Sequence, residues 1–195
     1  MLDQELCYTT QGCLQNHRIS PALRAKMIDW MIEVLHAYKQ DDQTFFMAVS
    51  ILDRYFQCKA TQLIPSDLHL TGVTCMFIAS KYEDYHPLRM QDLFKNICKE
   101  QYSVEQIKNK EIDIMMTIRY MVSVPTSLDF LKTLLQEVLG IEHVGRRSLT
   151  TEEKLKMDSL KSDSVEGTKL LLYRMSIYLA KMAMHSYEFS EILPS

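Results

Sequence analysis

The stretch that decides the fold begins near the N-terminus and reads Leu23-Arg24-Ala25-Lys26-Met27-Ile28-Asp29-Trp30-Met31-Ile32-Glu33-Val34. Its apolar residues recur every three or four positions, which is the repeat of one helix face. Ser20 can cap this helix, and Pro21 suits its first position. A second apolar strip, with Ile28 and Ile32, predicts that other helices cover this one on most sides.

The same spacing predicts further helices along the chain, and the prolines fall between them. Asp42 can cap the second helix and Ser66 the third, while Ser103 with Gln106 has the pattern of a capping box. Gly72 in the third helix would allow another helix to approach closely. Thr126 can cap the sixth helix and Gly140 can end it. These helices are expected over residues 42–56, 66–81, 90–98, 103–121, 127–139 and 170–185.

The composition indicates a soluble, all-α protein. Of its 195 residues, 47% are hydrophobic and 24% are charged, and glycine and proline number five each, too few for a β-rich protein. The net charge of −3, with scattered lysine and arginine, argues against a nucleic-acid or membrane surface. No apolar run reaches the roughly 20 residues of a membrane span, and no secretion signal precedes the first helix.

The chain shows no pattern of an enzyme, a cofactor site or a metal site. Its five cysteines form no C-x-x-C pair, which is typical of a reduced, intracellular protein in the nucleus or the cytoplasm. The histidines lack metal-ligand spacing, and there is no nucleophile motif or glycine-rich phosphate loop. We therefore expect a protein without catalytic residues, cofactor or metal.

The segment over residues 141–167 is polar, and the sequence predicts a mobile insertion there. The helix expected over 170–185 is instead too apolar to be solvated. With only two helices after residue 125, these apolar faces need another surface. Either they pack back onto the first helices, or a missing segment or another chain completes them. We favour completion, and expect an exposed apolar patch over 170–185.

Four strings resemble the cyclin box. They are the opening stretch, then Leu52-Asp53-Arg54-Tyr55, then Ile78-Ala79-Ser80-Lys81-Tyr82-Glu83-Asp84, and finally Met121-Val122-Ser123-Val124-Pro125-Thr126. In order, they resemble the first three helices of the box and the exit from it. The resemblance covers about 20–139 and is closest to mitotic A/B-type cyclins. It implies an N-terminal segment and a five-helix cyclin box over 1–124, and a partial second box over 125–195.

The resemblance implies a partner, a cyclin-dependent protein kinase, and the residues that bind it. Lys81 and Glu111 match the pair that hydrogen-bonds main-chain groups of the kinase beside its αC helix. The matching apolar positions of that interface are Ile78, Tyr82, Met115 and Val122. From the residues alone, Lys81 is a cation ending a helix, Glu111 is solvated, and the apolar residues are core.

Two more groups follow from the resemblance. Arg24 and Asp53 match a pair inside the box, which we interpret as a structural ion pair. A stripe matches a patch that receives R-x-L peptides of substrates and inhibitors, and it consists of Leu23, Met27, Trp30 and Glu33. From spacing alone this stripe is core. Lys26 replaces a family isoleucine and His69 a frequent glutamine, so whether the patch accepts a basic peptide stays open.

The sequence thus leaves more than one class of function. The favoured one is a regulatory subunit that binds and activates a cyclin-dependent kinase and helps to recruit substrates. The alternative is a cyclin-fold structural or scaffolding subunit without kinase activation. A nucleic-acid binder resembling transcription factor IIB would use the same fold, but it would need a basic face that the net charge disfavours.

Overall fold

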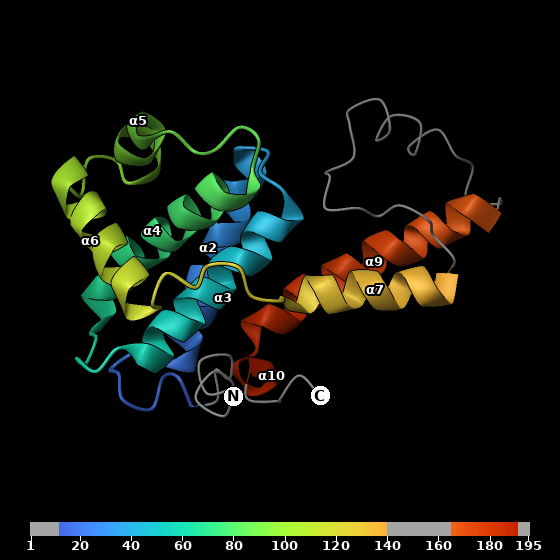
Figure 1. The fold of residues 1–195 in the computed structure, drawn as a ribbon, viewed down its shortest axis with the longest axis horizontal. Coiled ribbons are helices and arrows are strands. Elements are labelled where there is room, and N and C mark those ends of the chain that lie inside the picture. The colour runs from blue at the N-terminus through green and yellow to red at the C-terminus, as the bar shows by residue number, and fades with distance from the viewer. Residues whose placement is uncertain (1–11, 140–164, 191–195) are drawn as a thin grey trace. The chain divides into compact units, whose positions relative to one another are not determined.

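The computed structural model describes residues 12–139 and 165–190, and these residues contain helices and no β-strand, as the sequence predicts (Figure 1). They form two compact units, one of residues 12–124 with 184–190 and one of residues 125–139 with 165–183. The helices are α2 (Pro21–Ala37), α3 (Asp42–Cys58), α4 (Pro65–Glu83), α5 (Met90–Asp92) continued by the π-helical η1 (Leu93–Ile97), α6 (Val104–Thr117), α7 (Ser127–Leu139), α9 (Val165–His185) and α10 (Tyr187–Ser190).

Two predicted helix starts are confirmed by their hydrogen bonds. The Ser20 hydroxyl accepts the N–H of Leu23 at 3.2 Å at the start of α2. Ser103 and Gln106 form the capping box of α6, in which each side chain accepts the backbone N–H of the other. These bonds satisfy N–H groups that a helix leaves unpaired at its start. Local sequence alone therefore defines where α2 and α6 begin.

Two other predicted caps are wrong by one or two residues. Asp41, rather than Asp42, caps α3 by accepting the N–H of Gln43 at 2.9 Å. Helix α4 starts at Pro65, so Ser66 is already helical. Proline favours the first helical position because its fixed φ suits a helix and its missing N–H has no role there.

Two predicted boundaries also differ from the structure. Helix α6 ends at Thr117 rather than near residue 121, because Arg119 and Tyr120 adopt the left-handed conformation, with φ of 54° and 58°. Helix α9 includes residues 165–167, which belong to the predicted polar insertion. The rest of that insertion, residues 141–164, and Gly140 lie outside the described residues.

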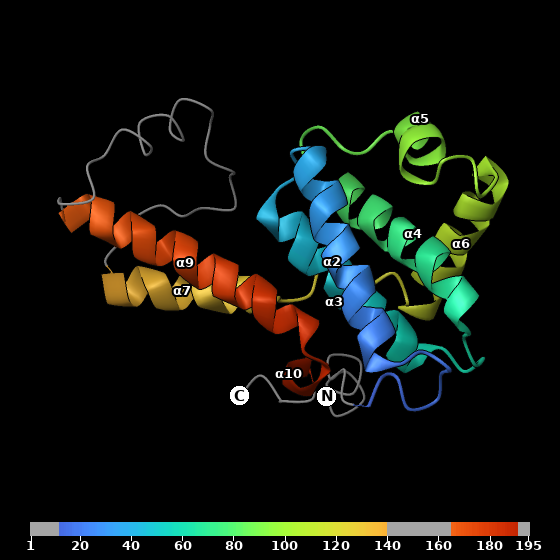
Figure 2. The same cartoon turned by 180° about the vertical axis from the view of Figure 1, so that it is seen from behind.

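Helix α4 is the central helix of the first unit. Its residues 71–80 are all buried, and α2, α3 and α6 pack against it (Figure 2). Gly72 permits the close approach of α2, because a Cβ atom at this position would lie 2.0 Å from the terminal methyl of Met27. The core of the first unit is therefore arranged around one helix that is covered on several sides.

A buried ion pair joins α2 to α3. The Arg24 guanidinium donates to both carboxylate oxygens of Asp53, at 2.7 and 2.6 Å. Burial lowers the pKa of Arg24, but the Asp53 carboxylate outweighs this and holds that pKa above its ordinary value. Arg24 also donates to the carbonyl of Met184 at 2.9 Å, and His185 pairs with Asp29 at 2.6 Å. The end of α9 thus belongs to the first unit.

The second unit exposes apolar side chains on both of its helices. On α7 they are Phe130, Leu134 and Val138, and on α9 they are Leu171, Leu172, Met175, Tyr178, Leu179 and Met182. Within each helix most of them are spaced at three or four residues, so each forms a strip. The division of the chain into a full and a partial box, and completion of the second by another chain, stay predictions.

Removing the charge of Asp53 is expected to destabilise the first unit strongly. In Asp53→Asn the buried Arg24 charge loses its counter-ion, which costs about 3–5 kcal/mol. Urea unfolding would measure this, with Glu33→Gln, an exposed acid on α2, as the control that should change stability by about 0.5 kcal/mol or less. A loss below about 1 kcal/mol for Asp53→Asn would contradict a structural role for the pair.

Candidate partner-binding site

The structure brings Lys81 and Glu111 together at the surface of the first unit. Lys81 lies in the last turn of α4 and its ammonium group forms an ion pair with the Glu111 carboxylate on α6. The Lys81 ammonium also lies 4.1 Å from the centre of the Phe77 ring. The two side chains are 39% and 22% exposed, so the pair is open to a partner and is not part of a core network.

The four apolar residues predicted beside this pair divide into two kinds. Ile78 and Val122 are only 4% and 7% exposed, so they pack in the core. Tyr82 is exposed and Met115 is partly exposed, and both can meet a partner. The burial of Ile78 and Val122 therefore supports core packing, which the helix spacing predicts for all four residues.

Three exposed apolar residues on or after α6 were not predicted from the sequence. Ile112 and Met116 lie one turn apart on α6, and Tyr120 follows its end. The buried stripe of the same helix contains Ile107 and Ile114. The outer side of a surface helix is normally polar, so apolar residues there favour contact with a partner. The spacing of Ile112 and Met116 was a signal that could have revealed them.

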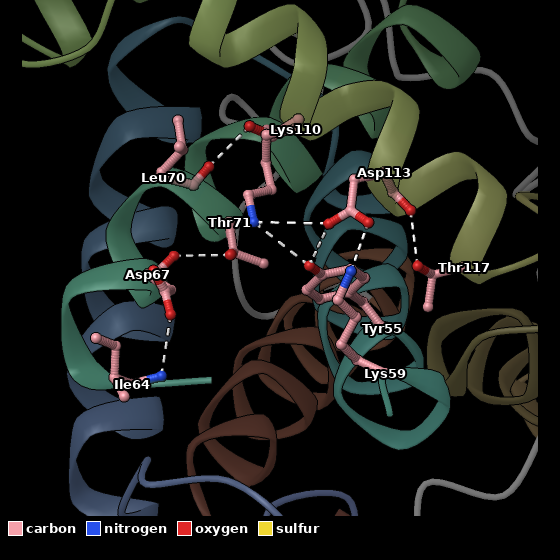
Figure 3. A network of polar contacts seen from close by, with 10 residues as sticks. Tyr55, Lys59, Ile64, Asp67, Leu70, Thr71, Lys110, Asp113 and Thr117 are labelled. Carbon is pink, nitrogen blue, oxygen red and sulfur yellow. Dashed lines mark hydrogen bonds and ion pairs between the residues drawn. The ribbon is translucent and has the colours of Figure 1, made fainter. Parts of the chain in front are cut away.

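A second missed feature is a polar network that joins α6 to α3. The Asp113 carboxylate accepts the hydroxyl of Tyr55 at 2.6 Å and the ammonium of Lys59 at 2.5 Å, and Lys110 lies 3.7 Å away (Figure 3). Burial raises the pKa of Asp113, but hydrogen bonds from Lys59 and Tyr55 outweigh it and hold that pKa below its ordinary value. The carboxylate is therefore charged at neutral pH.

The predicted docking stripe on α2 is only partly accessible. Met27 is buried and lies against Gly72, so it belongs to the core. Leu23 and Trp30 are half-buried, and Glu33 is exposed one turn further on. A partly exposed apolar surface, followed by an exposed acid, thus remains at these three positions.

His69 covers part of Trp30 in this stripe. The centres of the two rings lie 4.7 Å apart, and the His69 Nδ1 atom lies 3.2 Å from the Tyr102 hydroxyl. Burial lowers the pKa of His69 below its ordinary value. Lys26 is exposed on the same helix as Trp30. The two residues that depart from the family pattern therefore both lie at or near the stripe.

No group of three or more His, Cys, Asp or Glu side chains in residues 12–139 and 165–190 is arranged to hold a metal ion. In the same part of the chain, no helix combines the length and the apolar character that crossing a bilayer requires.

Acidification is expected to destabilise the chain through His69. The unfolded chain takes up a proton near the ordinary pKa of about 6.5, whereas the folded chain resists protonation until a lower pH. The contribution of neutral His69 to the free energy of unfolding is thus complete above about pH 6.5. It is lost as the pH falls from there through the lowered pKa of His69 in the folded chain. His69→Gln should lose less unfolding free energy than the unsubstituted chain between about pH 7 and pH 5. Equal losses would contradict the burial of a neutral His69.

Comparisons with known proteins agree with this geometry. The family model "Cyclin, N-terminal domain" matches residues 1–123. The G2/mitotic-specific cyclin-B1 of Oryzias luzonensis is 32% identical over 133 residues, which are 67% of this chain and 32% of that protein. The putative cyclin-A3-1 of Arabidopsis thaliana is 29% identical over 177 residues, 91% of this chain and 42% of that protein. The chain therefore spans about a third of the first relative and less than half of the second.

A solved structure shares the fold. The X-ray structure of a viral cyclin from herpesvirus saimiri aligns with a TM-score of 0.72 and 20% identity, and covers 100% of this chain and 73% of that one. The family model accounts for more than half of the chain, and the helices it matches form a compact box around α4. The chain belongs to the cyclin family.

Proposed function

We propose that this chain is a regulatory subunit that binds and activates a cyclin-dependent protein kinase through the surface around Lys81 and Glu111. The observation that carries the proposal is the exposed ion pair itself, which joins the end of α4 to α6. Exposed apolar side chains accompany it, among them Tyr82 and Ile112. An apolar centre with a polar, solvent-accessible rim is the usual composition of a protein-protein interface.

The ion pair can open at little cost when a partner arrives. Both side chains are partly exposed, and an ion pair at a protein surface typically contributes only about 0–1 kcal/mol, because water competes for both groups. Lys81 can then donate to carbonyl groups of a partner backbone, and Glu111 can accept its N–H groups. Charge-assisted hydrogen bonds are the stronger kind, so two of them can set the register of a partner helix or loop.

Activation follows if the chain binds one state of the kinase better than the other. A protein kinase requires an ion pair between a lysine of strand β3 and a glutamate of its αC helix. A subunit that contacts αC only in the active position shifts the population toward that position. The kinase then performs all of the catalysis, and this chain provides no catalytic residue.

The names of the relatives favour a role in cell division. The Oryzias relative is called G2/mitotic-specific. We place this chain inside the cell, in the nucleus or the cytoplasm where cell-cycle kinases act. Recruitment of substrates through Leu23, Trp30 and Glu33 is a further part of the proposal, although the exposed Lys26 disfavours basic peptides.

Removing both charges of the pair is expected to abolish kinase binding without unfolding the chain. Each charge-assisted hydrogen bond contributes about 1.5–3 kcal/mol, so Lys81→Ala with Glu111→Ala should weaken binding roughly 100-fold or more. Isothermal titration calorimetry against a panel of purified cyclin-dependent kinases would measure the affinity. A phosphotransfer assay on the same mixtures would measure activation.

The control replaces two exposed charges elsewhere in the box, with Lys95→Ala and Glu105→Ala. It should bind and activate the kinase like the unsubstituted chain. Binding of the unsubstituted chain without activation would favour the structural or scaffolding subunit. Unchanged affinity of the Lys81 and Glu111 variant would show that the kinase binds elsewhere.

A further inference from the structure

Helix α6 carries Glu111 but is held to the core by a narrow stripe. Its buried residues are Ile107 and Ile114, which lie two turns apart and nearly on one line along the helix. The neighbouring α3 and α4 bury most of their residues. A helix anchored along one line can roll about that line with little loss of buried area. Apolar packing alone therefore leaves the direction of Glu111 weakly defined.

The Asp113 network supplies the missing constraint. Both carboxylate oxygens are used, one by the buried Tyr55 hydroxyl and the other by Lys59. These two donors come from α3 and its C-terminal cap, whereas Asp113 belongs to α6. Lys110, one turn before Asp113, also lies 3.4 Å from the Tyr55 hydroxyl (Figure 3). The network fixes one side of α6 against a helix that is itself deeply buried.

Helix geometry links this network to Glu111. Successive residues are rotated by about 100°, so Asp113 and Glu111 lie about 200° apart around α6, measured on the outer side. The buried stripe with Ile114 lies between them on the inner side. If the helix rolls about this stripe, Asp113 and Glu111 move in opposite senses. When Asp113 moves toward α3, Glu111 moves away from α4, and the reverse. Fixing Asp113 against α3 therefore also fixes Glu111 against Lys81 of α4.

We propose that Asp113 is a positioning residue, whose contacts with Tyr55 and Lys59 set the roll of α6 that holds Glu111 beside Lys81. The importance of this role for kinase binding rests on the proposed function. The claim that Asp113 holds Glu111 beside Lys81 concerns the free chain and can be tested without a kinase. If Asp113 contributed only to overall stability, the Lys81–Glu111 contact would instead be unchanged in every Asp113 or Lys59 variant that still folds.

Zero-length cross-linking with a carbodiimide tests the inference, because the reagent joins an ammonium and a carboxylate only when they touch. Peptide mass spectrometry would give the yield of the Lys81–Glu111 bond in the free chain. Asp113→Asn keeps an acceptor for Tyr55 but loses the charge that holds Lys59, and Lys59→Met removes the donor. Both should lower the yield several-fold. Lys59→Arg, which retains the charge, and Glu105→Gln, an exposed acid on α6, should retain the yield.

A double-mutant cycle against the kinase provides the second arm. If Asp113 acts through Glu111, Asp113→Asn weakens binding in the unsubstituted chain and adds no further loss in Glu111→Gln. An unchanged cross-link yield in folded Asp113→Asn, or additive losses in the cycle, would overturn the positioning role. If the cross-link falls but no cyclin-dependent kinase binds the unsubstituted chain, the positioning role stands and the proposed function fails.

Discussion

The buried guanidinium of Arg24 is the interaction on which the arrangement of the first unit depends. It binds both oxygens of Asp53 and the carbonyl of Met184, so one charge joins α2, α3 and the end of α9. A buried charge costs several kcal/mol unless its partners have good geometry. The positions of α2 and α3 are therefore closely constrained, and both of these helices pack against α4. The end of α4 in turn carries Lys81.

The candidate site combines a well-anchored helix with a less anchored one. Lys81 lies at the end of α4, whose buried residues define its position. Glu111 lies on α6, which has a narrow buried stripe and relies on the Asp113 network for its orientation. Polar contacts of this kind specify direction, whereas apolar contacts chiefly supply free energy. The proposed contact with a partner backbone would require both kinds of interaction, because a roll of α6 would move Glu111 away from Lys81.

Much of the fold could be predicted from sequence, because helix periods and caps are local signals. Ser20 and the Ser103–Gln106 box show this, whereas two adjacent acids, Asp41 and Asp42, could not be separated by pattern. The site required the resemblance, since Lys81 and Glu111 are 30 residues apart and no local pattern relates them. For Ile78 the helix spacing predicted the core and the resemblance predicted the interface, and only the structure, in which Ile78 is buried, shows that it packs in the core. The role of Asp113 could not be predicted, because its partners Tyr55 and Lys59 lie 58 and 54 residues away and no local pattern relates them to it.

The most direct test of the central claim is a crystal structure of this chain bound to a cyclin-dependent kinase. The account predicts that the Lys81–Glu111 ion pair opens, and that both side chains hydrogen-bond main-chain groups of the kinase beside its αC helix. Asp113 should keep its contacts with Tyr55 and Lys59. A complex in which the Lys81–Glu111 pair stays closed, with the kinase bound to another surface, would contradict the account.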